Sequence, residues 1–146
     1  MTTNNPPVIL LAEDDDNDVF FMRRALQKAQ VKFPLQVVTN GQEAVDYLSG
    51  EGKYNDRGAY PLPSIILLDL KMPFLDGFEV LIWIGRQPEL KKIPVAVLTS
   101  SAEDRDRRRA AELGAKAYFV KPPKPETMKE ILRLFDASGN GMVTSP

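Results

Sequence analysis

The chain has 146 residues, the length of one domain with a central sheet covered on both faces. Its formal net charge of −1, with acidic and basic residues interspersed, excludes a global field that attracts nucleic acid or a membrane. Because cysteine and histidine are absent, disulfides, thiolate chemistry and imidazole bases are excluded, and any metal would be bound through oxygen. Residues 1–7 form an extension without the features of a signal peptide, and no apolar run approaches the roughly 20 residues of a membrane helix. We therefore expect a cytoplasmic protein.

Five apolar segments alternate with five segments of helical periodicity along the chain. Short runs of branched aliphatic residues are typical of strands buried on both faces, whereas apolar residues spaced three or four apart indicate helices. These patterns predict strands at residues 8–12, 35–38, 65–69, 95–99 and 117–120, and helices at residues 17–30, 41–48, 77–87, 103–113 and 125–135. Gly114 and Pro125 support two of these boundaries, because glycine is favoured after the end of a helix and proline at its first position.

Two segments have no periodic pattern. Residues 49–63 are polar, rich in glycine and proline, and longer than a typical connection, so we expect an exposed, mobile loop. Residues 136–146 contain glycine and serine without a regular apolar pattern, and we expect a flexible, disordered tail. The folded domain is therefore expected to span residues 8–135.

The alternation of strands and helices predicts a doubly wound α/β fold. A strand followed by a helix and another strand favours a parallel sheet with right-handed crossovers and with helices on both faces. In such folds ligands bind beyond the carboxyl ends of the strands. Polar residues of this sequence end or directly follow four of the predicted strands at that end, namely Glu13 with Asp14, Asp69, Thr99 and Lys121.

Asp69 is the most informative of these residues. It ends an apolar strand, where a buried carboxylate costs free energy unless chemistry uses it. The acidic residues 13–16 also follow an apolar strand, and two such strand ends side by side would form an acidic pocket suited to a metal ion. A simpler alternative for Asp69 is that it caps a turn, and Asp15, Asp16 and Asn17 are interpreted as helix-capping residues.

An acidic pair, a lone aspartate, a hydroxyl and a lysine in this order resemble the CheY-like receiver domain of two-component response regulators. The resemblance covers residues 8 to about 135, and it includes the pairs Met72-Pro73 and Asp76-Gly77 after Asp69. It implies a flavodoxin-like fold with five parallel strands in the order 2-1-3-4-5 and five helices. It also implies that Asp69 is the phosphoacceptor.

The resemblance assigns a role to each of the other polar residues. Asp14 is implied to bind Mg²⁺ directly, Glu13 through a water molecule, and Lys71 through its backbone carbonyl, together with Asp69. Thr99 is implied to be the switch hydroxyl that bonds a phosphoryl oxygen. Lys121, which precedes a proline in an implied cis peptide, is expected to pair with the phosphoryl group, and Tyr118 to be the aromatic residue that rotates on phosphorylation.

The same resemblance indicates the partners. The phosphoryl donor would be a sensor histidine kinase or a phosphotransfer protein, and the loop 49–63 and the phrase Asn17-Asp18-Val19 resemble single-domain regulators paired with phytochrome-type kinases. We expect a phosphoacceptor signalling domain rather than an enzyme. The chain would be either a stand-alone receiver or a receiver excised from a longer protein. A homodimer is an open possibility. The helix at 103–113 carries charges instead of an apolar surface, whereas Ile82 and Trp83 lie opposite the core face of their helix, either as an exposed contact patch or sheltered by the loop.

Three alternatives are less well supported. A phosphatase similar to the haloacid dehalogenases needs a second aspartate two positions after the nucleophile, where this chain has Lys71. A binding module that does not depend on phosphorylation would be expected to lack Asp69, Thr99 or Lys121, all of which are present. A nucleotide-binding relative of the flavodoxins would need a phosphate-binding loop after the first strand, and the sequence there is acidic.

Overall fold

The three central strands of the sheet consist entirely of buried residues. In the computed structural model, which describes residues 7–137, these strands are β1 (Ile9–Ala12), β3 (Ile65–Leu68) and β4 (Val95–Thr99). The edge strands β2 (Leu35–Val38) and β5 (Ala117–Val120) are mostly half-buried. All pairs are parallel, and the order β2-β1-β3-β4-β5 confirms the predicted flavodoxin-like arrangement.

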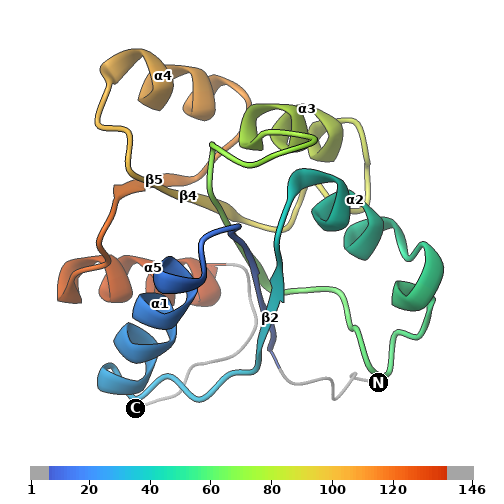
Figure 1. The fold of residues 1–146 in the computed structure, drawn as a ribbon, viewed down its shortest axis with the longest axis horizontal. Helices are drawn as coiled ribbons and strands as arrows, with labels where there is room; N and C mark the ends of the chain where they lie inside the picture. Colours follow the sequence, from blue (N-terminus) through green and yellow to red (C-terminus); the bar gives the residue numbers. More distant parts are fainter. Residues whose placement is uncertain (1–6, 138–146) are drawn as a thin grey trace.

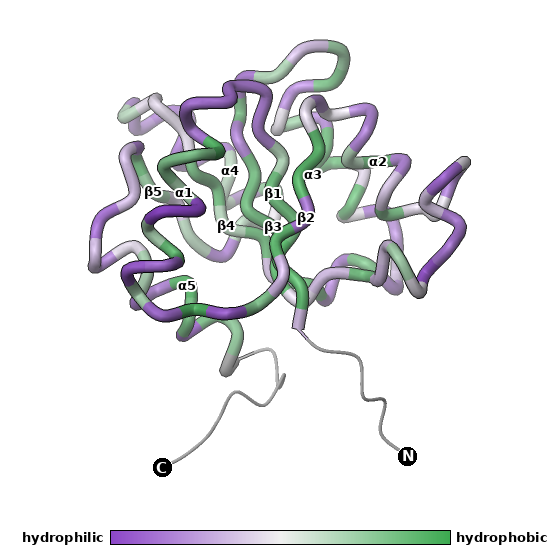
Figure 2. The backbone as a smooth tube through the Cα atoms, turned by 60° about the horizontal axis from the view of Figure 1, so that its bottom comes forward, coloured by the Kyte–Doolittle hydropathy of each residue, from purple (hydrophilic) through white to green (hydrophobic). Residues whose placement is uncertain are grey.

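The helices cover both faces of the sheet (Figure 1). Helices α1 (Asp16–Lys28) and α5 (Pro125–Ala137) pack on one face, and α2 (Gly41–Ser49), α3 (Gly77–Gly85) and α4 (Asp104–Glu112) lie on the other. Figure 2 shows the apolar strands between these two helical layers. The observed helix bounds agree with the predicted ones to within about two residues.

The loop at residues 49–63 differs from its prediction. It contains the short helix η1 (Gly52–Asn55), whose Tyr54 is buried with its ring centre 5.0 Å from that of Tyr47 on α2. The Arg57 guanidinium donates hydrogen bonds to the Tyr47 and Leu48 carbonyl oxygens at 2.8 and 2.9 Å. The expectation of an exposed loop is therefore wrong for these side chains, because they extend the core of the domain over α2.

Helix α3 presents the predicted face to the core. Val80, Leu81 and Ile84 are buried, whereas Ile82 and Trp83 are half-buried. Trp83 packs against the same apolar cluster as Tyr60 of the loop. This packing favours the alternative in which Trp83 contacts its own chain over the alternative of an exposed patch.

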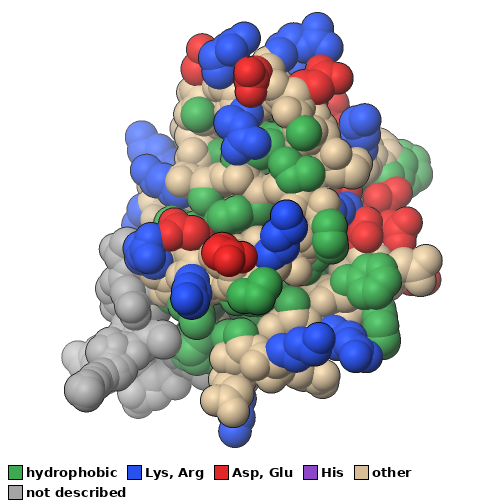
Figure 3. Space-filling model, turned by 90° about the vertical axis from the view of Figure 1, so that its left-hand side faces the viewer, with side chains coloured by type: hydrophobic (Ala, Val, Ile, Leu, Met, Phe, Trp, Pro, Cys, Tyr) green, Lys and Arg blue, Asp and Glu red, His purple; other side chains and the backbone are tan. Residues whose placement is uncertain are grey.

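The surface of the domain carries the mixture of charged residues that the composition predicts (Figure 3). Within residues 7–137 no helix is long and apolar enough to cross a membrane. On the face shown in Figure 3, basic and acidic side chains lie interspersed among apolar ones. Helix α5 continues to Ala137, so the first two residues of the predicted tail are helical, and the rest of that tail and most of the N-terminal extension lie outside the described residues.

Candidate functional site

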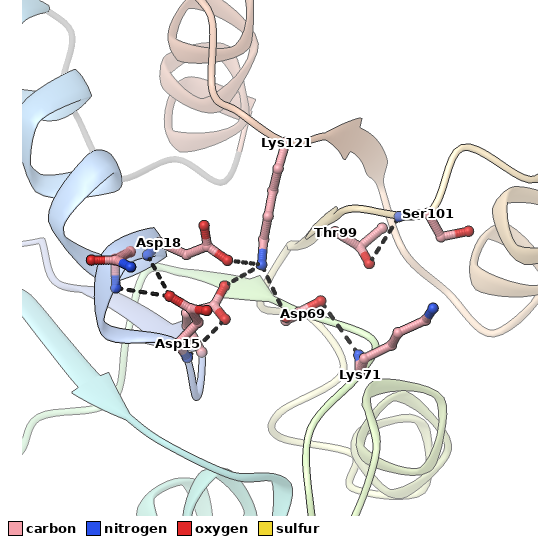
Figure 4. Close-up of polar contacts among 9 residues, drawn as sticks. Asp15, Asp18, Asp69, Lys71, Thr99, Ser101 and Lys121 are labelled. Atoms are coloured by element: carbon pink, nitrogen blue, oxygen red, sulfur yellow. Dashed lines mark hydrogen bonds and ion pairs between the residues drawn. The ribbon is translucent and has the colours of Figure 1, made fainter.

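A lysine joins three carboxylates at the carboxyl edge of the sheet (Figure 4). The Lys121 ammonium lies 2.6 Å from Glu13 Oε1, 2.7 Å from Asp18 Oδ2 and 3.1 Å from Asp69 Oδ2. The side chains of Glu13 and Asp69 are buried, whereas those of Lys121 and Asp18 are partly exposed, at 12% and 32%. The structure thus brings Glu13, Asp69 and Lys121 together at one edge of the sheet.

The sheet topology explains this convergence. Strands β1 and β3 are neighbours in register, so Glu13 and Asp69 emerge side by side, and the Asp69 N–H donates to the Ala12 carbonyl at 3.1 Å. Lys121 follows β5, where its N–H donates to the Thr99 carbonyl at 2.8 Å, and the bond to Pro122 is cis as the resemblance implied. The long lysine side chain then spans the edge of the sheet from β5 to β1.

Helix α1 contributes Asp18 to the site, a residue that the sequence alone did not single out. Asp15 is the N-cap of this helix, since its side chain accepts hydrogen bonds from the N–H groups of Asn17 and Asp18. Asp18 therefore lies in the first turn, where side chains tilt toward the helix N-terminus and hence toward the strand ends. That tilt was a usable signal for its contact with Lys121.

Burial and neighbouring charges shift the pKa values of Glu13 and Lys121. Burial raises the pKa of Glu13 to about 7, although the hydrogen bond with Lys121 acts in the opposite direction and the Asp69 charge adds to the increase. Burial alone would lower the pKa of Lys121, but the hydrogen bonds to Asp18 and Glu13 and the charge of Asp69 outweigh it and raise this pKa above its ordinary value. Lys121 therefore stays protonated and supplies positive charge next to Asp69.

The same edge offers a set of oxygen donors for a metal ion. Carboxylate oxygens of Glu13, Asp14 and Asp69 lie within 4.8 Å of one another, with Asp14 exposed and the other two residues buried. Donors of this kind, without nitrogen or sulfur, suit a hard divalent cation such as Mg²⁺. Clustered carboxylates also repel one another, and a cation between them relieves that repulsion.

Thr99 and Lys71 lie next to the carboxylates. Thr99 is completely buried at the end of β4, and its hydroxyl accepts a hydrogen bond from the Ser101 N–H at 3.4 Å. Within residues 7–137 Thr99 makes no hydrogen bond to Asp69. The Lys71 N–H donates to Asp69 Oδ1 at 3.3 Å, so that both oxygens of Asp69 have a donor (Figure 4).

A second polar network runs from Thr99 toward α4. The Ser101 hydroxyl donates to Asp106 Oδ2 at 2.7 Å, and the Tyr118 hydroxyl donates to the Ser101 carbonyl at 2.9 Å. The Arg107 guanidinium lies 4.6 Å from the centre of the half-buried Tyr118 ring. Sequence reasoning singled out Thr99 and Tyr118, but it interpreted Asp106 and Arg107 only as part of a charged helix.

The comparisons with known proteins agree with this geometry. The response regulator receiver domain family matches residues 9–133. The chain belongs to this family. Response regulator Rcp1 from Synechocystis is 38% identical over 113 residues, which cover 77% of this chain and 73% of Rcp1. The probable methanogenesis regulatory protein FilR2 from Methanothrix harundinacea is 38% identical over 106 residues, 73% of this chain and 66% of FilR2.

Solved structures of receivers superpose on nearly the whole chain. The Mn²⁺-bound form of Rcp1 matches with a TM-score of 0.75 and 33% identity, over 97% of this chain and 99% of that one. The phosphorylated cyanobacterial phytochrome response regulator RcpA matches with a TM-score of 0.76 and 32% identity over the same shares. The protein is thus a receiver domain of a two-component response regulator, similar to phytochrome response regulators.

Proposed function

We propose that this receiver accepts a phosphoryl group on Asp69 from a sensor histidine kinase or a phosphotransfer protein, in a reaction that requires Mg²⁺. The observation that carries the proposal is the contact between the Lys121 ammonium and the buried Asp69, 3.1 Å apart, at the edge where Glu13 and Asp14 converge. A lysine fixed beside a carboxylate and a cluster of oxygen donors is suited to phosphoryl transfer. The phosphorylated form of the similar RcpA and the Mn²⁺-bound form of Rcp1 support it.

The protein's own residues would act mainly by position and charge. An Asp69 oxygen attacks phosphorus, the P–N bond of the donor phosphohistidine breaks, and its electron pair stays on the departing imidazole nitrogen. Lys121 donates a hydrogen bond to a phosphoryl oxygen and offsets its charge. Thr99 ends β4, the neighbour of β3, and because its hydroxyl accepts the Ser101 N–H, its own proton is left for donation to another phosphoryl oxygen.

Asp14, Asp69 and the Lys71 carbonyl would hold Mg²⁺ directly, and Glu13 through a water molecule. When bound, the ion neutralises charge on the transferred group. The Glu13 carboxylate has a partner in Lys121, and the Asp14 side chain is exposed at the mouth of the site. Asp14 is therefore the ligand whose removal should disturb the remaining contacts least.

Phosphorylation would then change the surface around α4 and β5. A Thr99 hydroxyl drawn toward the phosphoryl group releases the Ser101 N–H, and Ser101 also holds both Asp106 and the Tyr118 hydroxyl. Tyr118 would rotate into the space that this shift opens, and the equilibrium between two arrangements of α4 and β5 would change. The output is then a binding event, and not turnover of a substrate.

We further propose that the protein acts in the cytoplasm with a phytochrome-type kinase. The similarity to RcpA, a phytochrome response regulator, supports this choice of donor. A homodimer remains a secondary proposal, because the half-buried Trp83 leaves only part of its side chain for a contact between two copies.

The test of the function is mass spectrometry after incubation with acetyl phosphate and Mg²⁺. One added phosphoryl group is expected on the parent and none on an Asp69→Asn variant, which keeps the size of the side chain but removes the nucleophile. Labelling of Asp69→Asn at the parent's level would refute Asp69 as the acceptor.

The metal assignment has a separate test. Asp14→Ala should abolish labelling with Mg²⁺ while leaving the urea midpoint close to that of the parent, because Asp14 is exposed. Asp16→Ala, a change of an exposed neighbour outside the donor set, is the matched control and should be labelled normally. Full labelling of Asp14→Ala in excess chelator would contradict a bound cation.

A further inference from the structure

Phe74 combines two unfavourable properties. Among the described residues, four large apolar side chains are exposed, and Phe74 is the most exposed of them at 82%. It also has a φ of +71°, a left-handed conformation that crowds the Cβ atom of any residue except glycine. A bulky residue in this conformation is unusual and points to a role outside the stability of the fold.

The loop that carries Phe74 is firmly held on both sides. Met72 is buried before it, and Leu75 packs against the core cluster after it. A Cβ atom on Gly41 would lie 1.9 Å from the Leu75 carbonyl oxygen, and one on Gly77 only 2.4 Å from the Asp69 carbonyl oxygen. Because the loop is pressed this closely against α2 and β3, the exposure of Phe74 is a property of a fixed backbone.

A hollow of about 380 Å³ lies beside Phe74, between the loop and α2. It contains two carboxylates and no basic side chain, and its lining consists of Asn40, Gln42, Glu43, Asp46, Phe74 and Leu75. The surface therefore joins one apolar ring to a negatively charged wall. The complementary partner is a segment with an apolar side chain flanked by lysine or arginine.

This surface lies at the same edge of the sheet as the phosphoacceptor site. Phe74 is five residues after Asp69, and α2 begins directly after β2, at the same edge of the sheet. A protein seated on Phe74 would thus lie within reach of Asp69.

We propose that Phe74 and the acidic hollow receive a basic segment of the histidine kinase that donates the phosphoryl group. An apolar side chain of that segment packs on the Phe74 ring, and its basic groups face Glu43 and Asp46. Phe74 then determines which donor is accepted and takes no part in the chemistry. The inference rests on the proposed function of Asp69. Its test uses two phosphoryl donors, so that the docking proposal and the proposed function of Asp69 can fail separately.

The experiment compares phosphoryl transfer to the parent and to Phe74→Asn. Asparagine tolerates the left-handed conformation but removes the ring, so this variant should fold with an unchanged or higher urea midpoint. One donor is acetyl phosphate, which needs no docking surface, and the other is an autophosphorylated bacterial phytochrome histidine kinase. Leu62→Asn is the matched control, because Leu62 is also exposed, at 46%, but precedes β3 at the opposite edge of the sheet.

Phe74→Asn should lose about tenfold in the rate of transfer from the kinase, as expected for an aromatic anchor, and nothing in the rate from acetyl phosphate. Leu62→Asn should match the parent with both donors. Asp46→Asn should slow transfer from the kinase only, by about two- to threefold at low salt and by less at high salt, because an exposed charge is screened.

Equal rates from the kinase for Phe74→Asn and the parent would overturn the proposal. So would a parent that acetyl phosphate labels and the kinase does not, since this surface would then not receive such a donor. A parent that acetyl phosphate fails to label would instead refute the proposed function of Asp69.

Discussion

Two arginines pair with tyrosines in different regions of this receiver, and the two pairs differ in how firmly they are held. Arg57 lies 6.0 Å from the Tyr47 ring and donates hydrogen bonds to the carbonyl oxygens of Tyr47, Leu48 and Tyr60 at 2.8, 2.9 and 3.1 Å. Arg107 lies closer to its ring, 4.6 Å from Tyr118, but has a single long hydrogen bond of 3.5 Å to the Tyr118 carbonyl.

The difference lies in what each arginine satisfies. Arg57 supplies donors to the Tyr47 and Leu48 carbonyls in the last turn of α2, where the Gly50 N–H also reaches the Tyr47 carbonyl at 3.3 Å. Arg107 is exposed on α4 and holds only the ring and carbonyl of one residue on the edge strand. The same chemical pair thus serves stability in the loop at residues 49–63, whereas beside β5 it is weak enough to open during a switch.

The largest expected effect comes from removing the aromatic core of that loop. Tyr54→Ala deletes a buried ring that packs on Tyr47 and Tyr60, with ring centres 5.0 Å away in both cases. We expect a loss of about 3–5 kcal/mol in the free energy of unfolding, measured in urea. Tyr54→Phe is the control. It keeps the ring and gives up only the 3.5 Å hydrogen bond to Glu43, so a loss as large as that of Tyr54→Ala would contradict this account.

Arg57→Ala should come next. It removes the side-chain donor from the Leu48, Tyr60 and Tyr47 carbonyl oxygens, of which the Tyr47 carbonyl keeps the Gly50 N–H at 3.3 Å, and we expect the free energy of unfolding to fall by about 2 kcal/mol. Arg57→Lys should recover only part of this loss, because an ammonium cannot reproduce the planar fork of donors. Lys53→Ala, a change of an exposed residue in the same loop, should have little effect. Equal midpoints for Arg57→Ala and Lys53→Ala would refute the anchoring role.

This contrast also shows what the sequence could predict. The branched aliphatic runs at β1, β3 and β4 predicted the buried strands, because strand formation follows from local periodicity. The parallel topology that these strands imply then placed Glu13 and Asp69 side by side. The contacts of Tyr54 and Arg57 had no such signal. They join an aperiodic loop to a helix, and the abundance of glycine and proline suggested exposure.

The functional site, like the fold, was predictable only where its residues follow from the positions of the strands. Asp69, Lys121 and the acidic pair follow strand ends, so their convergence depended only on the order of the strands. Asp18, Ser101 and Arg107 act through particular side-chain directions, and charged or hydroxyl residues at such positions are ordinarily solvated. The tilt of side chains in the first turn of α1 indicates Asp18, whereas only the three-dimensional arrangement separates Ser101 and Arg107 from their neighbours.

Alkaline pH should weaken the loop region. Burial raises the pKa of Tyr47 to about 12, with a smaller contribution from its tyrosine neighbours, while the Arg57 charge acts in the opposite direction. The folded state therefore keeps this proton after the unfolded chain has lost it. The corresponding stability is fully present below the ordinary tyrosine pKa of about 10 and is lost as the pH rises through about 12.

A variant of Tyr47 isolates this effect. Tyr47→Phe loses the 2.8 Å hydrogen bond to the Pro61 carbonyl, so we expect a loss of about 1 kcal/mol at neutral pH. The free energy of unfolding of the parent should fall by up to about 1.4 kcal/mol per pH unit more steeply than that of the variant in the alkaline range. Parallel pH profiles of the two proteins would contradict an anchored Tyr47 hydroxyl.

The smallest effect on stability, below about 1 kcal/mol, is expected for Arg107→Ala, because cation–π contacts at exposed sites are weak. Its effect on switching should be clear, since Tyr118 can leave its place only by giving up the Arg107 guanidinium and the Ser101 carbonyl. Without Arg107 the ring needs less free energy to rotate. A beryllofluoride titration with Mg²⁺, monitored by NMR of the Tyr118 ring, should therefore reach its midpoint at about two- to fivefold lower beryllofluoride concentration.

Arg105→Ala is the control for this effect. It removes an exposed arginine of the same helix that contacts Glu103 and not the ring, and it should leave the midpoint unchanged. If both variants shift the midpoint equally, the net charge of α4 controls the switch; if only Arg107→Ala shifts it, the contact with the ring does.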